Sequence, residues 1–263
     1  NYNPEGSALR KDQLEMLKAL EAFARICREN DIQWWLCSGT LLGAARHKGF
    51  IPWDDDMDIS MFDEDYKKLE KILVRMDDED YFYQCIKSDP EHVNVFGKFR
   101  KKNDPVFAAD QRSKYFKYQG VGLDVFSLEK SNGFAAHMAK FLYQNLIHPT
   151  QYIKNRFWRH FAIKSVQLLN FGLLIPLCRL IGRINHKGQY RYKLGSGFYQ
   201  CGFSAEDILP LRTMEFEGIE FPVPGNTDAY LTKIYGDWRK LPSEEQIRKT
   251  MHYPLYIKEI FGE

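Results

Sequence analysis

The chain has 263 residues, of which 44% are hydrophobic and 27% charged, and a net charge of only +2. This length can bury a sizeable core, and the balance excludes a disordered or fibrous chain. Five widely spaced cysteines form neither a disulfide ladder nor a zinc-binding pair, which favours a reducing compartment.

The first predicted element is an amphipathic helix over residues 7–30, a segment without Pro or Gly. Ser7 is in position to cap it. Its apolar side chains recur at a spacing of three: Leu14, Leu17, Leu20, Phe23 and Ile26.

A short strand is predicted over residues 32–37, "IQWWLC", because the run is apolar and rich in strand formers. The next stretch, "SGTLLGAARHKG", predicts a tight turn, a short helix and a stop at Gly49. A glycine in such a turn lets a ligand approach the backbone, and a helix N-terminus offers free N–H groups to a phosphate.

The segment "DMDISMF" predicts a strand whose period of two places Asp56, Asp58 and Ser60 on one face. Its apolar residues then point to the opposite face, toward a core. A charged helix is expected from about residue 63 to residue 76.

Further strands are predicted at 81–87, 93–101 and 121–128, and Asp124 in the last points away from its apolar face. Residues 134–185 are predicted to be mostly helical, with breaks near Pro149 and Pro176. The apolar part of this stretch is interrupted by polar residues, so a buried helix is expected rather than a membrane span. The C-terminal part predicts a hairpin over 212–224 that turns at Glu217–Gly218, then short helices near 226–235 and 243–250.

The aspartates indicate a metal site. Two carboxylates at positions i and i+2 of a strand lie roughly 6.5–7 Å apart, which suits one or two divalent cations. Asp124 is the candidate third ligand, because it is the acid in an otherwise apolar strand. Together with the turn Ser38-Gly39-Thr40, this pattern is typical of nucleotidyl or phosphoryl transfer.

The segment "WWLCSGTLLGAARHKGFIPWDDDMDISM" (34–61) closely resembles the LicD family. The resemblance extends to "DVFSL" (124–128) and to Tyr235-Gly236-Asp237-Trp238, and covers about residues 10–255. It implies an α+β fold with a nucleotidyltransferase-like mixed sheet and flanking helices. An additional basic helical lobe is expected from this chain's own charge pattern. The predicted parts are a catalytic core (1–130), the lobe (131–205) and a segment completing the donor site (206–263).

The resemblance also implies a reaction. Members of the family move phosphocholine from CDP-choline onto lipopolysaccharide, teichoic acid or capsular glycans, and relatives use CDP-linked ethanolamine, ribitol or glycerol. A hydroxyl of the acceptor would attack the β-phosphorus and CMP would leave. Asp56, Asp58 and Asp124 would bind Mg²⁺ or Mn²⁺, with Asp124 taking the hydroxyl proton. The residues implied for donor binding are Ser38, Gly39, Thr40, Arg46, Lys48, Arg248 and His252.

Plainer interpretations stay open for several of these residues. Asp54 and Asp55 are either solvated turn residues or metal contacts. Asp56 and Asp58 could form an exposed strand face, and Asp124 could be a hydrogen-bonded buried acid.

The basic residues also have plainer interpretations. Arg46, His47 and Lys48 could simply complement a helix dipole. Arg248 could be an ion-pair partner and His252 a surface histidine.

An aromatic box for a quaternary ammonium group is a further possibility, although core packing explains each aromatic residue better. The candidates are Trp53, Phe107, Tyr115, Tyr118 and Trp238.

Between Glu129 and Glu206 the sequence contains no Asp or Glu, but eleven basic residues interleaved with apolar ones. The interpretation is a lobe that lies against anionic lipid headgroups or a lipid-linked acceptor glycan; the alternative is a solvated face that happens to be basic. The start of the sequence shows no signal peptide, so the expected place is the cytoplasm, peripheral at the inner face of the membrane. No nucleic-acid partner is expected.

The leading hypothesis is thus a phosphocholine transferase of bacterial cell-surface glycans. The alternatives are the same reaction with another CDP-linked group, a catalytically silent binding or assembly protein on this fold, and a nucleotidyltransferase that leaves a nucleotide on its target.

Overall fold

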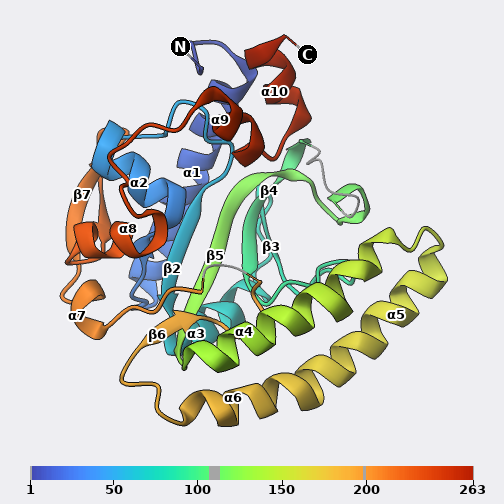
Figure 1. The fold of residues 1–263 in the computed structure, drawn as a ribbon. Coiled ribbons are helices and arrows are strands. Elements are labelled where there is room, and N and C mark those ends of the chain that lie inside the picture. The colour runs from blue at the N-terminus through green and yellow to red at the C-terminus, as the bar shows by residue number, and fades with distance from the viewer. Residues whose placement is uncertain (1, 107–112, 198–199, 263) are drawn as a thin grey trace.

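The computed structural model describes residues 2–106, 113–197 and 200–262 (Figure 1). Its centre is a six-stranded mixed sheet of order β1-β2-β5-β4-β3, with β6 paired to the end of β5. A separate hairpin pairs β7 with β8. The strands are β1 (Trp35–Leu36), β2 (Asp58–Phe62), β3 (Tyr81–Gln84), β4 (Gly97–Pro105), β5 (Gly120–Lys130), β6 (Tyr190–Tyr192), β7 (Arg212–Phe216) and β8 (Ile219–Val223).

Helices flank this sheet, so the α+β fold class predicted from the sequence is confirmed. The α-helices are α1 (Ala8–Glu29), α2 (Ser38–His47), α3 (Asp63–Leu73), α4 (Gly133–Leu142), α5 (Arg156–Leu169), α6 (Ile175–Arg183), α7 (Ala205–Ile208), α8 (Thr227–Tyr235), α9 (Glu244–Thr250) and α10 (Pro254–Phe261).

Helix α1 forms where the apolar spacing predicted it, and the Ser7 side chain caps it by accepting a hydrogen bond from the Arg10 N–H group. Its buried side, which includes Leu20 and Phe23, packs on β4 and β5. The N–H groups of Ala8 and Leu9 donate to Glu259 of α10 at 2.8 and 3.2 Å. The two ends of the chain therefore lie together, as Figure 1 shows.

Strands β2 and β5 are parallel neighbours, and their register positions the acidic residues. Asp58 lies opposite Asp124, and Ile59 opposite Val125. Ile59 and Val125 are fully buried, so apolar packing on the other side of the sheet holds this pair of strands. Since partners in register project to the same face, the two carboxylates come side by side.

Several predicted boundaries were wrong. The strand predicted at 93–101 begins only at Gly97, and the helix predicted to stop at Gly49 ends at His47, where its C-cap Lys48 adopts a left-handed conformation with φ 58°. Asp56 precedes β2 instead of belonging to it. The hairpin is confirmed, with Glu217 and Gly218 at its turn (φ 51° and 80°).

The lobe consists of α4 and a long helix beneath the sheet (Figure 1). The break near Pro149 is confirmed, because a 3-10 turn over His148–Tyr152 ends in extended backbone at Ile153. The break near Pro176 is wrong. Helix α5, a π-helical turn over Asn170–Leu174 and α6 run on as one helix, Arg156–Arg183, in which Pro176 occupies the first turn of α6.

The expectation of a buried helix in this region is wrong as well. Among the described residues, Arg156–Arg183 is the one helix that is long and apolar enough to cross a membrane, and only 22% of its most apolar window is buried. Strand β6 returns the chain to the main sheet, because residues 190–192 pair with the end of β5. The division into three parts stays a prediction.

A buried ion pair fixes the long helix to the core. Arg159 of α5 is 2% exposed and donates from Nε and Nη2 to the Glu91 carboxylate at 3.0 and 2.9 Å. The His160 ring lies 2.8 Å from the same carboxylate, and Arg159 stacks 3.7 Å from the centre of the Tyr115 ring. Because a buried charge without its partner costs several kcal/mol, this contact holds the lobe in one position.

Candidate active site

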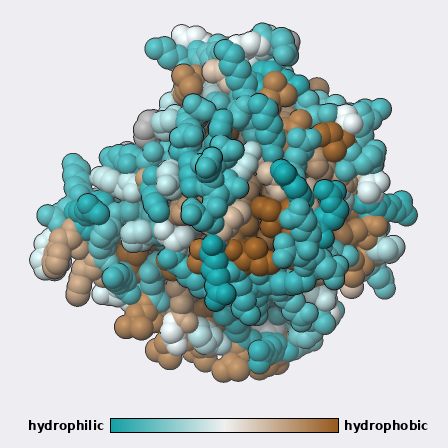
Figure 2. Space-filling view, turned by 180° about the vertical axis from the view of Figure 1, so that it is seen from behind, coloured by the Kyte–Doolittle hydropathy of each residue, from teal (hydrophilic) through white to brown (hydrophobic). Residues whose placement is uncertain are grey.

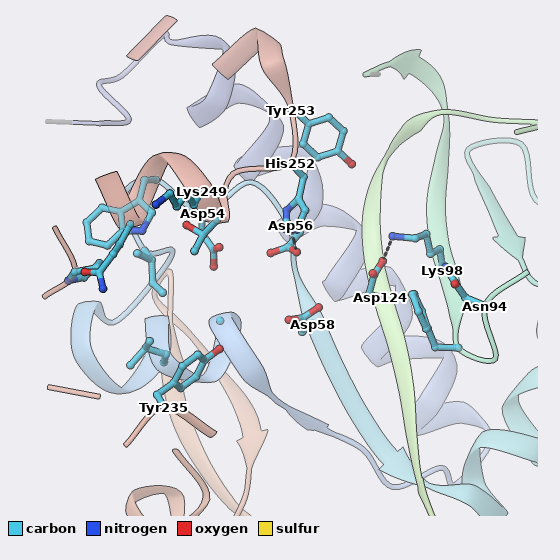
Figure 3. Close-up of a pocket in the computed structure, with 18 of the residues that line it drawn as sticks. Asp54, Asp56, Asp58, Asn94, Lys98, Asp124, Tyr235, Lys249, His252 and Tyr253 are labelled. Atoms are coloured by element: carbon cyan, nitrogen blue, oxygen red, sulfur yellow. Dashed lines mark hydrogen bonds and ion pairs between the residues drawn. The ribbon is translucent and has the colours of Figure 1, made fainter. Parts of the chain in front are cut away.

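A cavity of about 1110 Å³ opens beside β2 and β5, and three of the four clustered aspartates face it (Figure 3). Asp54, Asp56 and Asp58 line the cavity, whereas Asp55 points the other way. This alternation follows from extended backbone, in which successive side chains leave on opposite sides. Asp54 is therefore placed to contact a ligand in the cavity, whereas Asp55 is not.

Asp124 joins the acids from β5, and Lys98 joins Asp124 from β4. The register places Asp58 opposite Asp124 and Lys98 opposite Asp124, so the three side chains form a row across the sheet. The Lys98 ammonium lies 2.5 Å from Asp124 Oδ1, the ion pair drawn in Figure 3. The order of side chains across the sheet is therefore Asp58, Asp124 and Lys98.

Burial and mutual repulsion act on these carboxyl groups. Burial raises the pKa of Asp56 to about 6, and the charges of Asp55 and Asp124 add to that rise while His252 opposes it. Burial, followed by the charges of Asp56 and Asp124, raises the pKa of Asp58 well above its ordinary value. The pKa of Asp54 rises for the same reasons. A divalent cation would relieve all of these repulsions.

Asp55 anchors the C-terminal segment to the acidic strand. Its buried carboxylate accepts hydrogen bonds from the backbone N–H groups of His252 and Tyr253 at 2.6 and 3.0 Å. It also lies 3.0 Å from His252 Nδ1, which in turn lies 3.5 Å from Asp56. The hydrogen bond with Asp55 raises the pKa of His252 to about 9, so the ring is a cation at neutral pH.

Two groups of residues could hold a metal ion. Asp55, Asp56 and His252 have ligand atoms within 4.8 Å of one another. However, Asp55 already accepts several hydrogen bonds, and a metal ion at this group would have to displace the proton of His252. Asp56, Asp58 and Asp124 instead offer carboxylate oxygens to the cavity, the donor type that Mg²⁺ and Mn²⁺ prefer, so this set fits the expected ion.

The first turn of α2 supports the acids. Gly39 lines the cavity, and a Cβ atom at that position would lie 2.8 Å from Asp54 Oδ2, so a larger residue would displace the Asp54 carboxylate. Thr40 Oγ1 accepts the Asp58 N–H at 2.8 Å, which fixes the start of β2. Ser38 is buried with φ 46°, and its hydroxyl lies 3.4 Å from the Tyr192 hydroxyl. Ser38 and Thr40 thus position the site without lining it.

The cationic candidates separate into two kinds. Arg46 lines the cavity and donates to the carbonyl oxygens of Trp238 and Lys240 at 2.9 and 3.4 Å, joining α2 to the Tyr-Gly-Asp-Trp segment. His252 lines it too. Lys48 and Arg248 do not: Lys48 is exposed and lies 3.8 Å from Glu215, and Arg248 pairs with Glu244 at 3.1 Å.

Sequence reasoning missed the cationic wall of the cavity. Lys98 and Arg100 lie two residues apart on β4, and both line it. Arg100 is 7% exposed, and its Nε atom has no hydrogen-bond partner within the described part of the chain. The alternation of basic residues in "KFRKK" was the available signal. That alternation does not say which face of the strand meets the acids, because this depends on the pairing of β4 with β5.

The aromatic candidates also divide. Trp53 and Trp238 line the cavity on the side of α2, whereas Tyr115 and Tyr118 do not line it. Phe107 lies outside the described residues. The cavity is also lined by aromatic side chains that were not singled out: Phe96, Phe116, Tyr143 and Tyr253.

Comparison with known proteins identifies related chains. A family model described as "LicD/FKTN/FKRP, nucleotidyltransferase domain" matches residues 31–168, which include both β2 and β5. The chain is 28% identical to "Lipopolysaccharide cholinephosphotransferase LicD" of Haemophilus influenzae, over 96% of this chain and 97% of that protein. It is 40% identical to human "Ribitol 5-phosphate transferase FKRP" over 60 residues, 21% of this chain and 12% of that protein.

Proposed function

The chain belongs to the LicD family of phosphotransferases, and on that premise we propose that it transfers phosphocholine from CDP-choline to a hydroxyl group of a bacterial cell-surface glycan, releasing CMP. The observation that carries this proposal is the alignment of Asp58 and Asp124 on neighbouring strands, with Asp56 beside them, at the wall of one large cavity. The acceptor would belong to a lipopolysaccharide, teichoic acid or capsule.

Asp56, Asp58 and Asp124 would hold Mg²⁺ or Mn²⁺. The ion would neutralise the donor diphosphate and polarise the phosphorus that is attacked. A carboxylate oxygen of Asp124 accepts the proton of the acceptor hydroxyl as the new P–O bond forms. The bond between the β-phosphorus and the bridging oxygen breaks, and CMP leaves with the electron pair. Lys98 holds Asp124 in position for this proton transfer.

The donor is proposed to lie on the side of the cavity formed by α2 and the C-terminal segment. Phosphate would lie at the N-terminus of α2, where backbone N–H groups are free to donate, and Arg46 and the His252 cation add positive charge. Ser38 and Thr40 hold this wall in place. Lys48 and Arg248 point elsewhere and receive no donor contact in this proposal.

A second donor class has support of its own. The short match to a ribitol 5-phosphate transferase covers part of the same chain, so CDP-ribitol, like CDP-ethanolamine or CDP-glycerol, is the alternative donor. A catalytically silent binding protein is less well supported, because such a protein has no need to keep buried, mutually repelling acids.

Incubation with CDP-choline, CDP-ethanolamine and CDP-ribitol in turn, with Mg²⁺ and acceptor glycans, tests the proposal. CMP release is measured, and the mass increase of the glycan identifies the group transferred. We expect CMP release with CDP-choline that stops when EDTA is added. Release with another CDP donor instead would select the alternative, and no release from any donor would contradict both.

A further inference from the structure

The outer face of the helical lobe is apolar. Among the described residues, twelve of the sixteen large hydrophobic side chains that remain exposed lie between residues 134 and 184. In Figure 2, hydrophobic side chains gather along the lower edge of the molecule, where the long helix lies in Figure 1. The twelve are Phe134, Phe141, Tyr152, Phe157, Trp158, Phe161, Leu168, Leu169, Leu173, Leu177, Leu180 and Ile184.

The exposed residues of the long helix form one continuous stripe. Most follow one another three, four or seven positions apart, as one helix face requires. The step from Leu168 to Leu173 is five, and it coincides with the π-helical turn Asn170–Leu174. Because a π turn takes up an extra residue, it keeps the stripe on the same face.

Basic residues accompany this stripe. Lys154 and Arg156 are exposed at its beginning, Lys164 at its middle, and Arg183 and Lys187 at its end. No acid occurs between Glu129 and Glu206, so nothing in the lobe's own sequence balances them. An apolar stripe flanked by lysine and arginine complements a bilayer with anionic headgroups, because each basic residue near such a surface favours binding.

The inner face of the same helix argues against a position across a membrane. Arg159 is buried against Glu91, Asn170 is fully buried, and Arg179 lies 3.0 Å from Glu129 of β5. A spanning helix would strip the two arginines of their carboxylate partners and place the Asn170 amide in hydrocarbon. Both ends of the lobe also return to the same sheet, through β5 and β6.

We propose that the outer face of α5 and α6, with the exposed phenylalanines of α4, is a membrane-docking surface that lies in the interfacial plane of a bilayer containing anionic lipids. The apolar stripe enters the region between headgroups and acyl chains, and the basic residues contact the lipid phosphates. This docking does not depend on the proposed function.

The position of the cavity also gives the docking a role in the reaction. That role, unlike the docking itself, rests on the proposed function. Tyr143, His148 and Gln151, from the segment between α4 and α5, line the wall of the cavity opposite α2. The element that would lie on the membrane therefore also borders the active site. An acceptor glycan attached to a lipid could enter from this side without leaving the bilayer.

Vesicle flotation tests the surface directly. The whole chain is mixed with vesicles of phosphatidylcholine alone or of phosphatidylcholine with phosphatidylglycerol. We expect binding to the anionic vesicles to be at least about tenfold stronger. Binding to neither kind, or equal binding to both, would overturn the proposal.

Matched variants then identify the surface. Phe157→Gln, Phe161→Gln and Leu168→Gln, combined in one chain, should lower vesicle binding at least about tenfold. Leu209→Gln with Leu255→Gln removes exposed leucines outside the lobe and should leave binding unchanged. Equal loss in both variants, or no loss in the first, would contradict the assignment.

A second copy of this chain is the competing occupant, and sedimentation equilibrium without lipid distinguishes it. We expect a monomer whose Trp158 fluorescence is quenched by brominated lipid; a Trp158→Phe variant gives the background from the other tryptophans. A dimer that the triple substitution dissociates would overturn the membrane assignment.

Discussion

The acidic cavity and the helical lobe depart from ordinary protein architecture in opposite ways. The cavity brings like charges together where burial raises their pKa values, whereas the lobe leaves large apolar side chains in water. Both arrangements cost stability when the protein is alone. On the two proposals made above, each would become favourable with a particular partner, a divalent cation with a diphosphate in one case and a lipid surface in the other. The comparison teaches that chemistry and docking are separable here and can be tested one at a time.

The largest effect is expected from Asp58→Asn, which removes a carboxylate from the row across β2, β5 and β4. We expect kcat for CMP release to fall by about a thousandfold, since the metal contact contributes several kcal/mol. Asp80→Asn is the control, because Asp80 is exposed and outside the cavity. If Asp58→Asn kept wild-type activity with an unchanged fold by circular dichroism, Asp58 would not belong to the site.

Lys98→Met should have the next largest effect, a decrease in kcat of about 10- to 100-fold with a smaller change in KM. Lys101→Met is a closely matched control, because the Lys101 side chain is on the same strand, 21% exposed against 22% for Lys98, and also ion-paired. Partial recovery in Lys98→Arg would support a positioning role. A loss in the Lys101 variant as large as in the Lys98 variant would contradict it.

Asp55→Asn should show that Asp55 differs from its neighbours. An amide cannot accept all the donors that surround this carboxylate, so we expect the free energy of unfolding to fall by about 2–4 kcal/mol in urea titration. Asp228→Asn, at an exposed ion pair, should change it by less than about 1 kcal/mol. A stable but inactive Asp55 variant would instead place Asp55 among the metal ligands.

The free energy of unfolding should fall in mild acid because of His92. His92 is fully buried, its Nε2–H donates to the Phe96 carbonyl, and burial lowers its pKa to about 4 from 6.5. The unfolded chain therefore binds the proton more readily, so the contribution of neutral His92 is full above pH 6.5 and is lost as the pH falls toward 4. The loss is at most about 3 kcal/mol. The free energies of unfolding of wild type and His92→Gln, measured by urea titration across this pH range, should change with pH at different slopes. Parallel pH dependences would refute this role of His92.

The smallest effect is expected from the lobe variant, assayed with a soluble glycan acceptor. This variant combines Phe157→Gln, Phe161→Gln and Leu168→Gln in one chain. Its rate of CMP release should stay within about twofold of wild type, because surface substitutions away from the cavity leave its geometry unchanged. With an acceptor embedded in anionic vesicles, the same variant should be slower. Equal slowing with both acceptors would show that docking and chemistry are not separable.

Local patterns predicted much of this molecule. The period of α1, the alternation around Asp58 and the turn at Glu217–Gly218 all depend on neighbours in sequence, and the structure has them. The family resemblance correctly pointed to the fold and the enzyme class.

The rest depends on contacts between distant segments. The sequence does not distinguish Asp55 from its three neighbouring aspartates, because its hydrogen-bond donors, residues 252 and 253, come from the other end of the chain. Lys98 acquires its partner only through the β4–β5 register, which no local pattern specifies. The apolar run in α5 and α6 suggested burial, because sequence alone does not show that one side of that helix has no covering element.

Direct measurement of metal binding tests the central claim. Mn²⁺ is titrated into the protein with and without CMP, and free Mn²⁺ is followed by electron paramagnetic resonance, for wild type, Asp58→Asn and the control Asp80→Asn. We predict that wild type and Asp80→Asn bind Mn²⁺, more tightly with the nucleotide present, and that Asp58→Asn loses this binding. Equal binding by all three proteins, or none by wild type, would contradict the account.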